Sequence, residues 1–157
     1  MRTQIRQSAI DFVYREARLA DESRYDEWES LWSDEGVYWV PAEDGSQNPE
    51  VQLSIIYDNR ARISSRVRQL KSGSHHTQIP VSQMRRLISN AEVSERSGLV
   101  GVASNFLLVE YRRAETNIWS GRTEHTLRVT DGDFEMVQKK VCLANGSGCI
   151  PTLSFLI

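Results

Sequence analysis

Apolar residues near the start of the chain recur every three or four positions. The set is Ile5, Ala9, Phe12, Val13, Ala17 and Ala20. Residues three and four apart share one face of a helix, so this spacing predicts an amphipathic helix over about residues 3–20. Glu16 lies beside the apolar face, and we interpret it as a solvated position at the edge of the stripe.

A second helical pattern is dominated by aromatic side chains. Its apolar positions are Tyr25, Trp28, Leu31 and Trp32, and they would share one face of a helix of about three turns. The acidic turn that follows predicts the end of this helix, with Gly36 as the residue just past its C-terminus. Residues 37–40 are β-branched or aromatic and predict a strand that ends at Pro41.

A polar segment and a third helical pattern come next. Residues 42–52 contain Gly, Asn and Pro and predict a loop. The apolar spacing then predicts a helix over about residues 54–70, with Arg60 interrupting its inner stripe. Residues 71–80 predict another loop, which holds the adjacent His75 and His76.

From Gln83 onward the pattern changes from helical to alternating. After the segment that begins there, further alternating segments cover residues 99–111, 118–130 and 134–144. Residues 113–117 and Asp131-Gly132 predict the turns between them, and Asp-Gly is a strong hairpin signal. Residues 150–157 form a largely apolar segment, so we expect it to be paired or buried.

Helices followed by strands indicate an α+β fold, and long strands coil into a sheet with a concave side. We therefore predict a single domain over residues 1–157. It would be a cone-shaped half-barrel with a strongly curved, mostly antiparallel sheet and three N-terminal helices covering its concave side. Such a cone would enclose a cavity that the aromatic face of residues 25–32 helps to close.

Composition and charge exclude several classes of function. The net charge of -2 argues against generic nucleic-acid binding, and no apolar run approaches the ~20 residues of a membrane span. The start of the chain lacks the apolar core of a signal peptide, so we expect a cytoplasmic protein. Residues 1–60 carry 13 acidic and 6 basic side chains, and residues 61–157 carry 8 and 13. These opposite charges could pair within one chain or between neighbouring chains.

Short motifs follow one another along nearly the whole chain. They are Arg15-Glu16-Ala17-Arg18-Leu19, Asp21, Arg24-Tyr25-Asp26-Glu27-Trp28, Val37-Tyr38-Trp39-Val40-Pro41, Ile56-Tyr57-Asp58, Arg60, Arg66-Val67, Arg85-Arg86-Leu87-Ile88-Ser89-Asn90-Ala91 and Lys139-Lys140-Val141. In this order they resemble the small (β) subunits of aromatic-ring-hydroxylating dioxygenases. The resemblance implies the cone-shaped α+β fold that scytalone dehydratase and ketosteroid isomerase also use.

The resemblance further implies a non-catalytic structural role in aromatic compound catabolism. In this family a large (α) subunit carries a Rieske [2Fe–2S] cluster and a mononuclear Fe(II), which perform the O2-dependent dihydroxylation. The small subunit would form a trimer beneath an α trimer in an α3β3 assembly. No cofactor or metal is expected in this chain, because a Rieske centre requires paired Cys and His ligands that the sequence lacks.

Two other functions remain open. A stand-alone dehydratase or isomerase would use Tyr25 and Asp26 with His76 or His125, since a carboxylate in an apolar pocket can act as an acid or base near neutral pH. Asp26 is also explained as a partner of the helix dipole, Tyr25 as packing, and His125 as a core or interface histidine. The third class is a module that binds a small ligand in the same cavity.

The structural role predicts which residues meet partner subunits. We expect Phe106, Trp119 and Phe155 to form an exposed apolar surface that sister chains cover. Arg85 and Arg86 precede a strand and could reach carboxylates of a partner or simply be solvated. We hypothesise that Arg86→Glu weakens assembly without unfolding the chain. The aromatic substrate is not identified by this sequence.

Overall fold

The computed structural model describes residues 3–43, 45, 47–72, 82–144 and 155–157. The elements within these residues are α1 (Thr3–Asp21), α2 (Tyr25–Glu29), β1 (Trp32–Pro41), β2 (Ser54–Asp58), α3 (Arg60–Lys71), β3 (Gln83–Arg96), β4 (Leu99–Arg112), β5 (Glu115–Thr130) and β6 (Asp133–Leu143). In this part of the chain, no helix is both long enough and apolar enough to cross a membrane.

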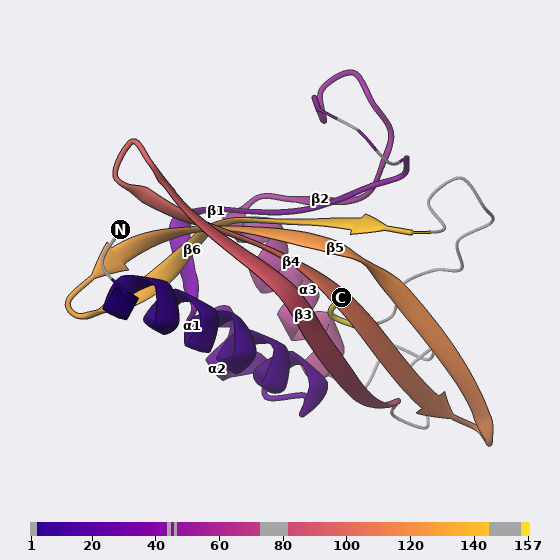
Figure 1. The fold of residues 1–157 in the computed structure, drawn as a ribbon. Coiled ribbons are helices and arrows are strands. Elements are labelled where there is room, and N and C mark those ends of the chain that lie inside the picture. The colour runs from indigo at the N-terminus through magenta and orange to yellow at the C-terminus, as the bar shows by residue number, and fades with distance from the viewer. Residues whose placement is uncertain (1–2, 44, 46, 73–81, 145–154) are drawn as a thin grey trace.

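The strands form one curved sheet in the order β2-β1-β6-β5-β4-β3. Neighbouring strands are antiparallel except β1 and β6, which are parallel. The helices α1, α2 and α3 lie together on one side of this sheet (Figure 1). The predicted α+β cone, with a mostly antiparallel sheet and helices on its concave side, is therefore confirmed.

The alternating segments form the long strands that their pattern predicts. Along β4 the buried residues Val102, Phe106 and Leu108 occupy even positions, because successive side chains of a strand point to opposite faces. The hairpin between β5 and β6 turns at Asp131 and Gly132, which both have positive φ (32° and 84°). A two-residue turn with positive φ at both positions matches the right-handed twist of the strands that it joins.

The predicted three-turn aromatic helix is wrong in length. The helix α2 ends at Glu29, and Trp32 already begins β1. The backbone oxygen of Leu31 accepts a hydrogen bond from Met136 N of β6 (2.7 Å). The backbone at Leu31 is therefore paired with the sheet and does not continue the helix. Gly36 lies within β1 and ends no helix: a Cβ at this position would lie 2.6 Å from the ring of Trp32, which packs across it.

The predicted third helix is wrong in its first turn. Residues 54–58 form β2, an edge strand whose Tyr57 pairs with Trp39 of β1. The helix α3 starts only after Asn59, whose side chain accepts a hydrogen bond from Arg62 N (3.0 Å) and caps the helix. The β-branched and aromatic residues before this cap favour the strand.

The opposite charges of the two halves pair within the chain. Carboxylates of the N-terminal part meet bases from the remainder in the pairs Glu16–Lys139, Asp21–Arg86, Asp26–Lys71 and Glu35–Arg128. Two of these pairs are buried between α1 and the sheet, and they form the polar interior of the cone.

Candidate functional site

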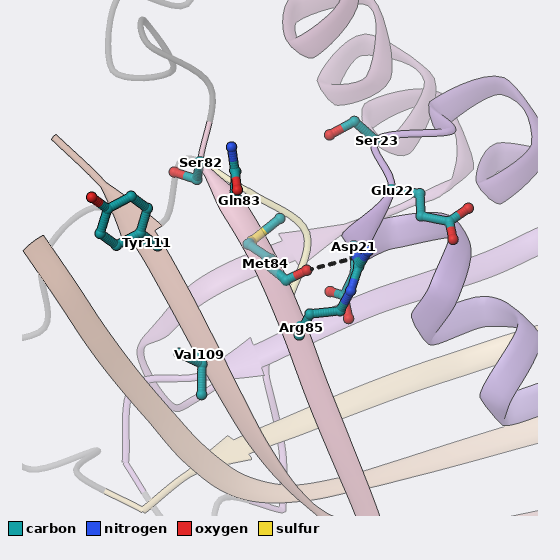
Figure 2. A pocket seen from close by; sticks show the side chains of 9 residues that line it. All are labelled: Asp21, Glu22, Ser23, Ser82, Gln83, Met84, Arg85, Val109 and Tyr111. Carbon is teal, nitrogen blue, oxygen red and sulfur yellow. Dashed lines mark hydrogen bonds between the residues drawn. The ribbon is translucent and has the colours of Figure 1, made fainter. Parts of the chain in front are cut away.

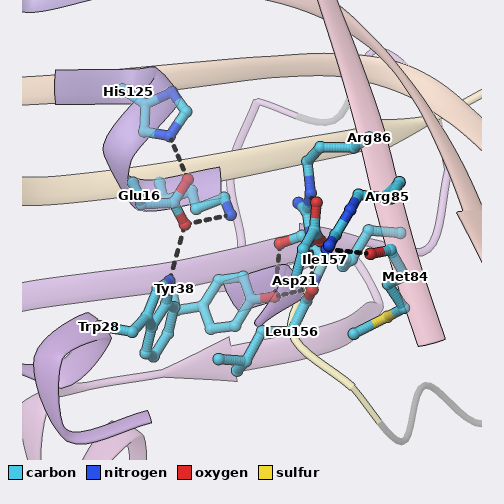
Figure 3. A network of polar contacts seen from close by, with 11 residues as sticks. Glu16, Asp21, Trp28, Tyr38, Met84, Arg85, Arg86, His125, Leu156 and Ile157 are labelled. Carbon is cyan, nitrogen blue, oxygen red and sulfur yellow. Dashed lines mark hydrogen bonds and ion pairs between the residues drawn. The ribbon is translucent and has the colours of Figure 1, made fainter. Parts of the chain in front are cut away.

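A cluster of polar side chains is buried where α1 crosses the sheet. It consists of Glu16, Trp28, His125 and Lys139, which we call the Glu16 cluster (Figure 3). Glu16 Oε1 accepts hydrogen bonds from Trp28 Nε1 (2.8 Å) and Lys139 Nζ (2.7 Å). Its Oε2 lies 3.3 Å from His125 Nε2. Glu16 is only 1% exposed, so its interpretation as a solvated edge position is wrong.

Burial and charge act in opposite directions on the pKa of Glu16. Burial alone would raise this pKa, but the Lys139 ammonium and the hydrogen bond to His125 hold it well below its ordinary value. Glu16 is therefore ionised at neutral pH. Burial lowers the pKa of His125 against the opposing effect of Glu16, so the imidazole is neutral and its Nε2–H donates to the carboxylate. Burial also lowers the pKa of Lys139, while Glu16 opposes that shift.

The space beside the Glu16 cluster is very small. A cavity of about 10 Å³ is lined by residues that include Glu16, His125 and Lys139. A volume of this size holds at most one water molecule. His125 Nδ1 has no hydrogen-bond partner among the described residues. The acid, base and ammonium of the cluster are thus paired with one another and leave no room for an organic substrate.

Arg86 forms a second buried group of charges. Its Nε and Nη2 lie 2.9 Å and 2.7 Å from Asp21 Oδ1 at the end of α1, and Nη2 also donates to the backbone oxygen of Leu156 (2.9 Å). The ion pair is nearly inaccessible to solvent. The structure therefore gives Arg86 partners within its own chain. Tyr38 lies between this group and the Glu16 cluster (Figure 3), and burial raises the pKa of its hydroxyl above the ordinary value.

The aromatic residues expected on an exposed surface point inward instead. Phe106, Trp119 and Phe155 are all buried within the single chain, and the rings of Trp119 and Phe155 pack edge to face at 5.7 Å. The expectation of exposure is wrong because it placed these residues on the opposite face of the strands. The large apolar side chains that do reach solvent on the sheet alternate with them.

The convex side of the sheet carries these exposed apolar residues. Leu87, Leu107 and Ile118 are 61%, 40% and 64% exposed. Leu87 of β3 pairs with Leu107 of β4, and Val109 pairs with Ile118 of β5, so they form one continuous group. We call Leu87, Leu107, Val109 and Ile118 the outer apolar patch.

Arg85 lines an open pocket near the end of α1. This pocket of about 510 Å³ lies between the turn after α1 and the start of β3 (Figure 2). Its lining is mixed, with Asp21, Glu22 and Arg85 beside Met84 and Tyr111. Arg85 is exposed and its Nη1 donates to the oxygen of Met84 (3.1 Å). The charges that line the pocket have both signs.

The structure does not bring Tyr25 and Asp26 together with His125, the candidate histidine among the described residues. Tyr25 and Asp26 line a shallow hollow on the outside of α2, where Lys71 Nζ binds Asp26 Oδ1 at 2.7 Å. His125 lines the small internal cavity, to which neither of them contributes. His76 lies outside the described residues. Sequence reasoning missed Glu16 and Lys139. Lys139 shares the inward alternation of Val141 and Leu143, and an inward lysine signals a buried acid.

A family model described as ring hydroxylating beta subunit matches residues 15–147. The chain belongs to this family. The match runs from the last third of α1 to beyond the end of β6, and so includes both the Glu16 cluster and the outer apolar patch. The predicted resemblance is thereby confirmed.

Individual beta subunits are similar to the chain over most of its length. The 2-halobenzoate 1,2-dioxygenase small subunit of Burkholderia cepacia is 30% identical over 142 residues, covering 87% of this chain and 86% of that protein. The toluate 1,2-dioxygenase subunit beta of Pseudomonas putida is 30% identical over 141 residues, covering 86% and 87%.

Solved structures show the same relationship. The beta subunit of the benzoate 1,2-dioxygenase from Burkholderia mallei superposes with a TM-score of 0.76 at 25% identity, covering 94% of this chain and 95% of that one. An NTF2-like protein with a cystatin-like fold from Novosphingobium aromaticivorans superposes with a TM-score of 0.63 at 15% identity, covering 90% and 82%. The second match shows the fold alone.

The donor groups that the structure describes in this beta subunit do not fit an iron centre. Within the described ranges, no three His, Cys, Asp or Glu side chains are placed to hold a metal ion. Glu16 and His125 lie side by side, but the carboxylate is already shared by Lys139 and Trp28. A facial triad needs two histidines and a carboxylate with open positions, and this cluster supplies one histidine.

Proposed function

We propose that this chain is the non-catalytic structural small subunit of a multicomponent aromatic-ring-hydroxylating dioxygenase. It supports a large subunit that performs the O2-dependent dihydroxylation in aromatic compound catabolism. The Rieske [2Fe–2S] cluster and the mononuclear Fe(II) belong to that large subunit. The small subunit associates as a trimer within an α3β3 assembly in the cytoplasm.

The observation that carries this proposal is that the cone interior has little free volume and that its polar groups are paired with one another. Substrate pockets are typically several hundred Å³ in volume and have a few convergent polar groups. Here the convergent polar groups surround a cavity of about 10 Å³. Glu16 is held ionised by Lys139, so it lacks the raised pKa of a general acid, and its oxygens are occupied by three donors.

The outer apolar patch supports the structural part of the proposal. A soluble chain rarely exposes contiguous apolar side chains on the face of a sheet unless another protein covers them. Leu87, Leu107 and Ile118 stay 40–64% exposed in the single chain, because they lie outside its core. A neighbouring subunit that covers them would remove them from water.

The proposal is tested by expressing the chain alone and with its large subunit. We expect the lone chain to bind no stoichiometric iron and to turn over no aromatic substrate, and the two chains together to purify as one active complex. Iron content, dioxygenase activity and the mass of each species by light scattering are the measurements. Turnover by the lone chain, or a stable active large subunit that never binds this chain, would contradict the proposal.

A further inference from the structure

Residues 155–157 lie inside the cone without belonging to a helix or strand. Phe155, Leu156 and Ile157 are 4%, 0% and 1% exposed, and we call them the tail segment. Figure 3 shows Leu156 and Ile157 beside Tyr38 and Arg86. The tail segment therefore fills part of the interior of the cone.

Side chains of the cone bind the backbone of the tail segment. The Tyr38 hydroxyl donates to the oxygen of Ile157 (2.7 Å) and accepts from its N–H (3.0 Å). Arg86 donates to the oxygen of Leu156 (2.9 Å) while Asp21 holds its guanidinium in place. Buried backbone groups usually pair with other backbone groups of a helix or sheet. Recognition of consecutive backbone groups by fixed side chains is instead how a site binds an extended peptide.

The side chains of the tail segment complete this arrangement. Phe155 packs edge to face on Trp119 of β5, with ring centroids 5.7 Å apart. Leu156 and Ile157 belong to the same apolar core as Trp28 and Tyr38. An aromatic anchor, two aliphatic side chains and three polar contacts to the backbone are the features of a bound apolar ligand.

We propose that the interior of the cone is a binding site for an extended apolar peptide, and that the chain's own tail segment occupies it. Tyr38 and Arg86 bind the backbone carbonyls, and the ring of Trp119 packs against the aromatic side chain. The tail segment is separable from the fold, so it can leave while the sheet stays intact. Release would expose a pocket that is closed while the tail segment is bound. This inference does not depend on the assembly proposed above.

Hydrogen exchange on the full chain tests separability. Tyr38→Phe keeps the ring but removes both contacts to Ile157, so exchange of the amides of the tail segment should rise roughly 5- to 10-fold. Exchange in β4 and β5 should stay unchanged. The matched control is Tyr57→Phe on the edge strand β2, because its side chain is 39% exposed and has no hydrogen bond to the tail segment among the described residues. It should alter neither region. If exchange in the tail segment and in the strands accelerates together, the segment does not open separately from the sheet and the proposal is wrong.

Binding in trans tests recognition. A chain that stops at residue 154 should bind the labelled peptide N-acetyl-Phe-Leu-Ile, measured by fluorescence anisotropy, whereas the full chain should not. Tyr38→Phe in the shortened chain should weaken this binding roughly 5- to 10-fold. A shortened chain with a native circular dichroism spectrum that fails to bind the peptide would overturn the proposal. If the shortened chain does not fold, the exchange experiment on the full chain decides.

Discussion

Each side of the sheet carries a few side chains of the kind that a soluble protein usually places on the other side. On the concave side, Lys139 and His125 meet Glu16 out of contact with water. On the convex side, Leu107 and Ile118 face solvent. Each inward charge requires a partner of the same chain, because an unpaired buried charge is very costly. Each outward apolar side chain is available to a partner from another chain. The buried charges of the concave side therefore contribute to the fold of the single chain, whereas the exposed apolar side chains of the convex side are available for assembly.

The largest effect is expected from reversing the buried charge of Arg86. Arg86→Glu places two carboxylates against each other near Asp21 and removes the donor to Leu156, so the free energy of unfolding should fall by at least about 3–5 kcal/mol. This corrects the earlier hypothesis that the substitution leaves the chain folded. The control is Arg85→Glu at the exposed neighbouring position, with a change within about 0.5 kcal/mol. Urea denaturation measures the stability of both variants. Equal stability would contradict the interpretation that the buried charges of the concave side stabilise the fold.

A similar loss is expected when the ammonium of the Glu16 cluster is removed. Lys139→Met leaves the Glu16 carboxylate buried without its cation and should cost about 3–5 kcal/mol of unfolding free energy. The double variant Glu16→Gln with Lys139→Met removes both charges and should recover much of that loss. Lys140→Met, on the partly buried next residue, is the matched control with a cost below about 1 kcal/mol. A double variant no more stable than the single one would show that charge pairing is not the cause.

A moderate effect is expected from pH. Burial lowers the pKa of His125 in the folded chain, so below about pH 6.5 the unfolded chain binds the extra proton more readily. Stability should therefore fall as the pH drops from 7 to 5, by at most about 1.4 kcal/mol per pH unit from this group. Glu16 has a lowered pKa, and its contribution is present above about pH 4.5 and lost on further acidification.

Denaturation curves at several pH values measure this dependence. His125→Gln should flatten the curve between pH 7 and 5 while leaving the decline below pH 4.5, because Glu16 remains. An unchanged slope in this variant would mean that His125 does not titrate differently in the folded and unfolded chain.

The smallest effect on stability, and the clearest effect on association, is expected at the outer apolar patch. Leu107→Asp should change the free energy of unfolding by about 1 kcal/mol or less, because the side chain is already partly in water. It should nevertheless weaken association with sister or large subunits, measured by light scattering and co-purification. Leu53→Asp is the control, because Leu53 is 84% exposed and lies before β2, away from the patch. Identical association of the two variants would remove the patch as the contact surface.

The fold was largely predictable because its signals are local and periodic. The alternation of the long strands and the Asp131-Gly132 turn determine their own geometry through side-chain period and backbone φ. The lengths of α2 and α3 were not predictable, because they depend on pairing with distant strands. Trp32 has helical spacing from Trp28, yet Leu31 is bound to Met136, more than a hundred residues away in the chain.

The Glu16 cluster was missed for a related reason. A glutamate beside an apolar stripe is solvated in most helices, and only its partners show that it is buried. Those partners are Lys139 and His125, which lie far along the chain. The helical pattern around Glu16 does not predict them, and the alternation of their strands does not predict Glu16. The inward residues Phe106 and Trp119 were misplaced because a strand has two faces, and composition does not state which one meets the helices.

The parallel pairing of β1 with β6 has a consequence for the order of folding. The strand β1 has only the short β2 as an early neighbour, and its other partner, β6, is the last of the described strands in chain order. During synthesis β1 cannot pair with β6 until β6, which ends at residue 143, has emerged. Contacts so distant in sequence slow folding, and the aromatic surfaces of Trp28 and Trp32 stay uncovered meanwhile. The nascent chain should therefore depend on chaperones until β6 has been synthesised.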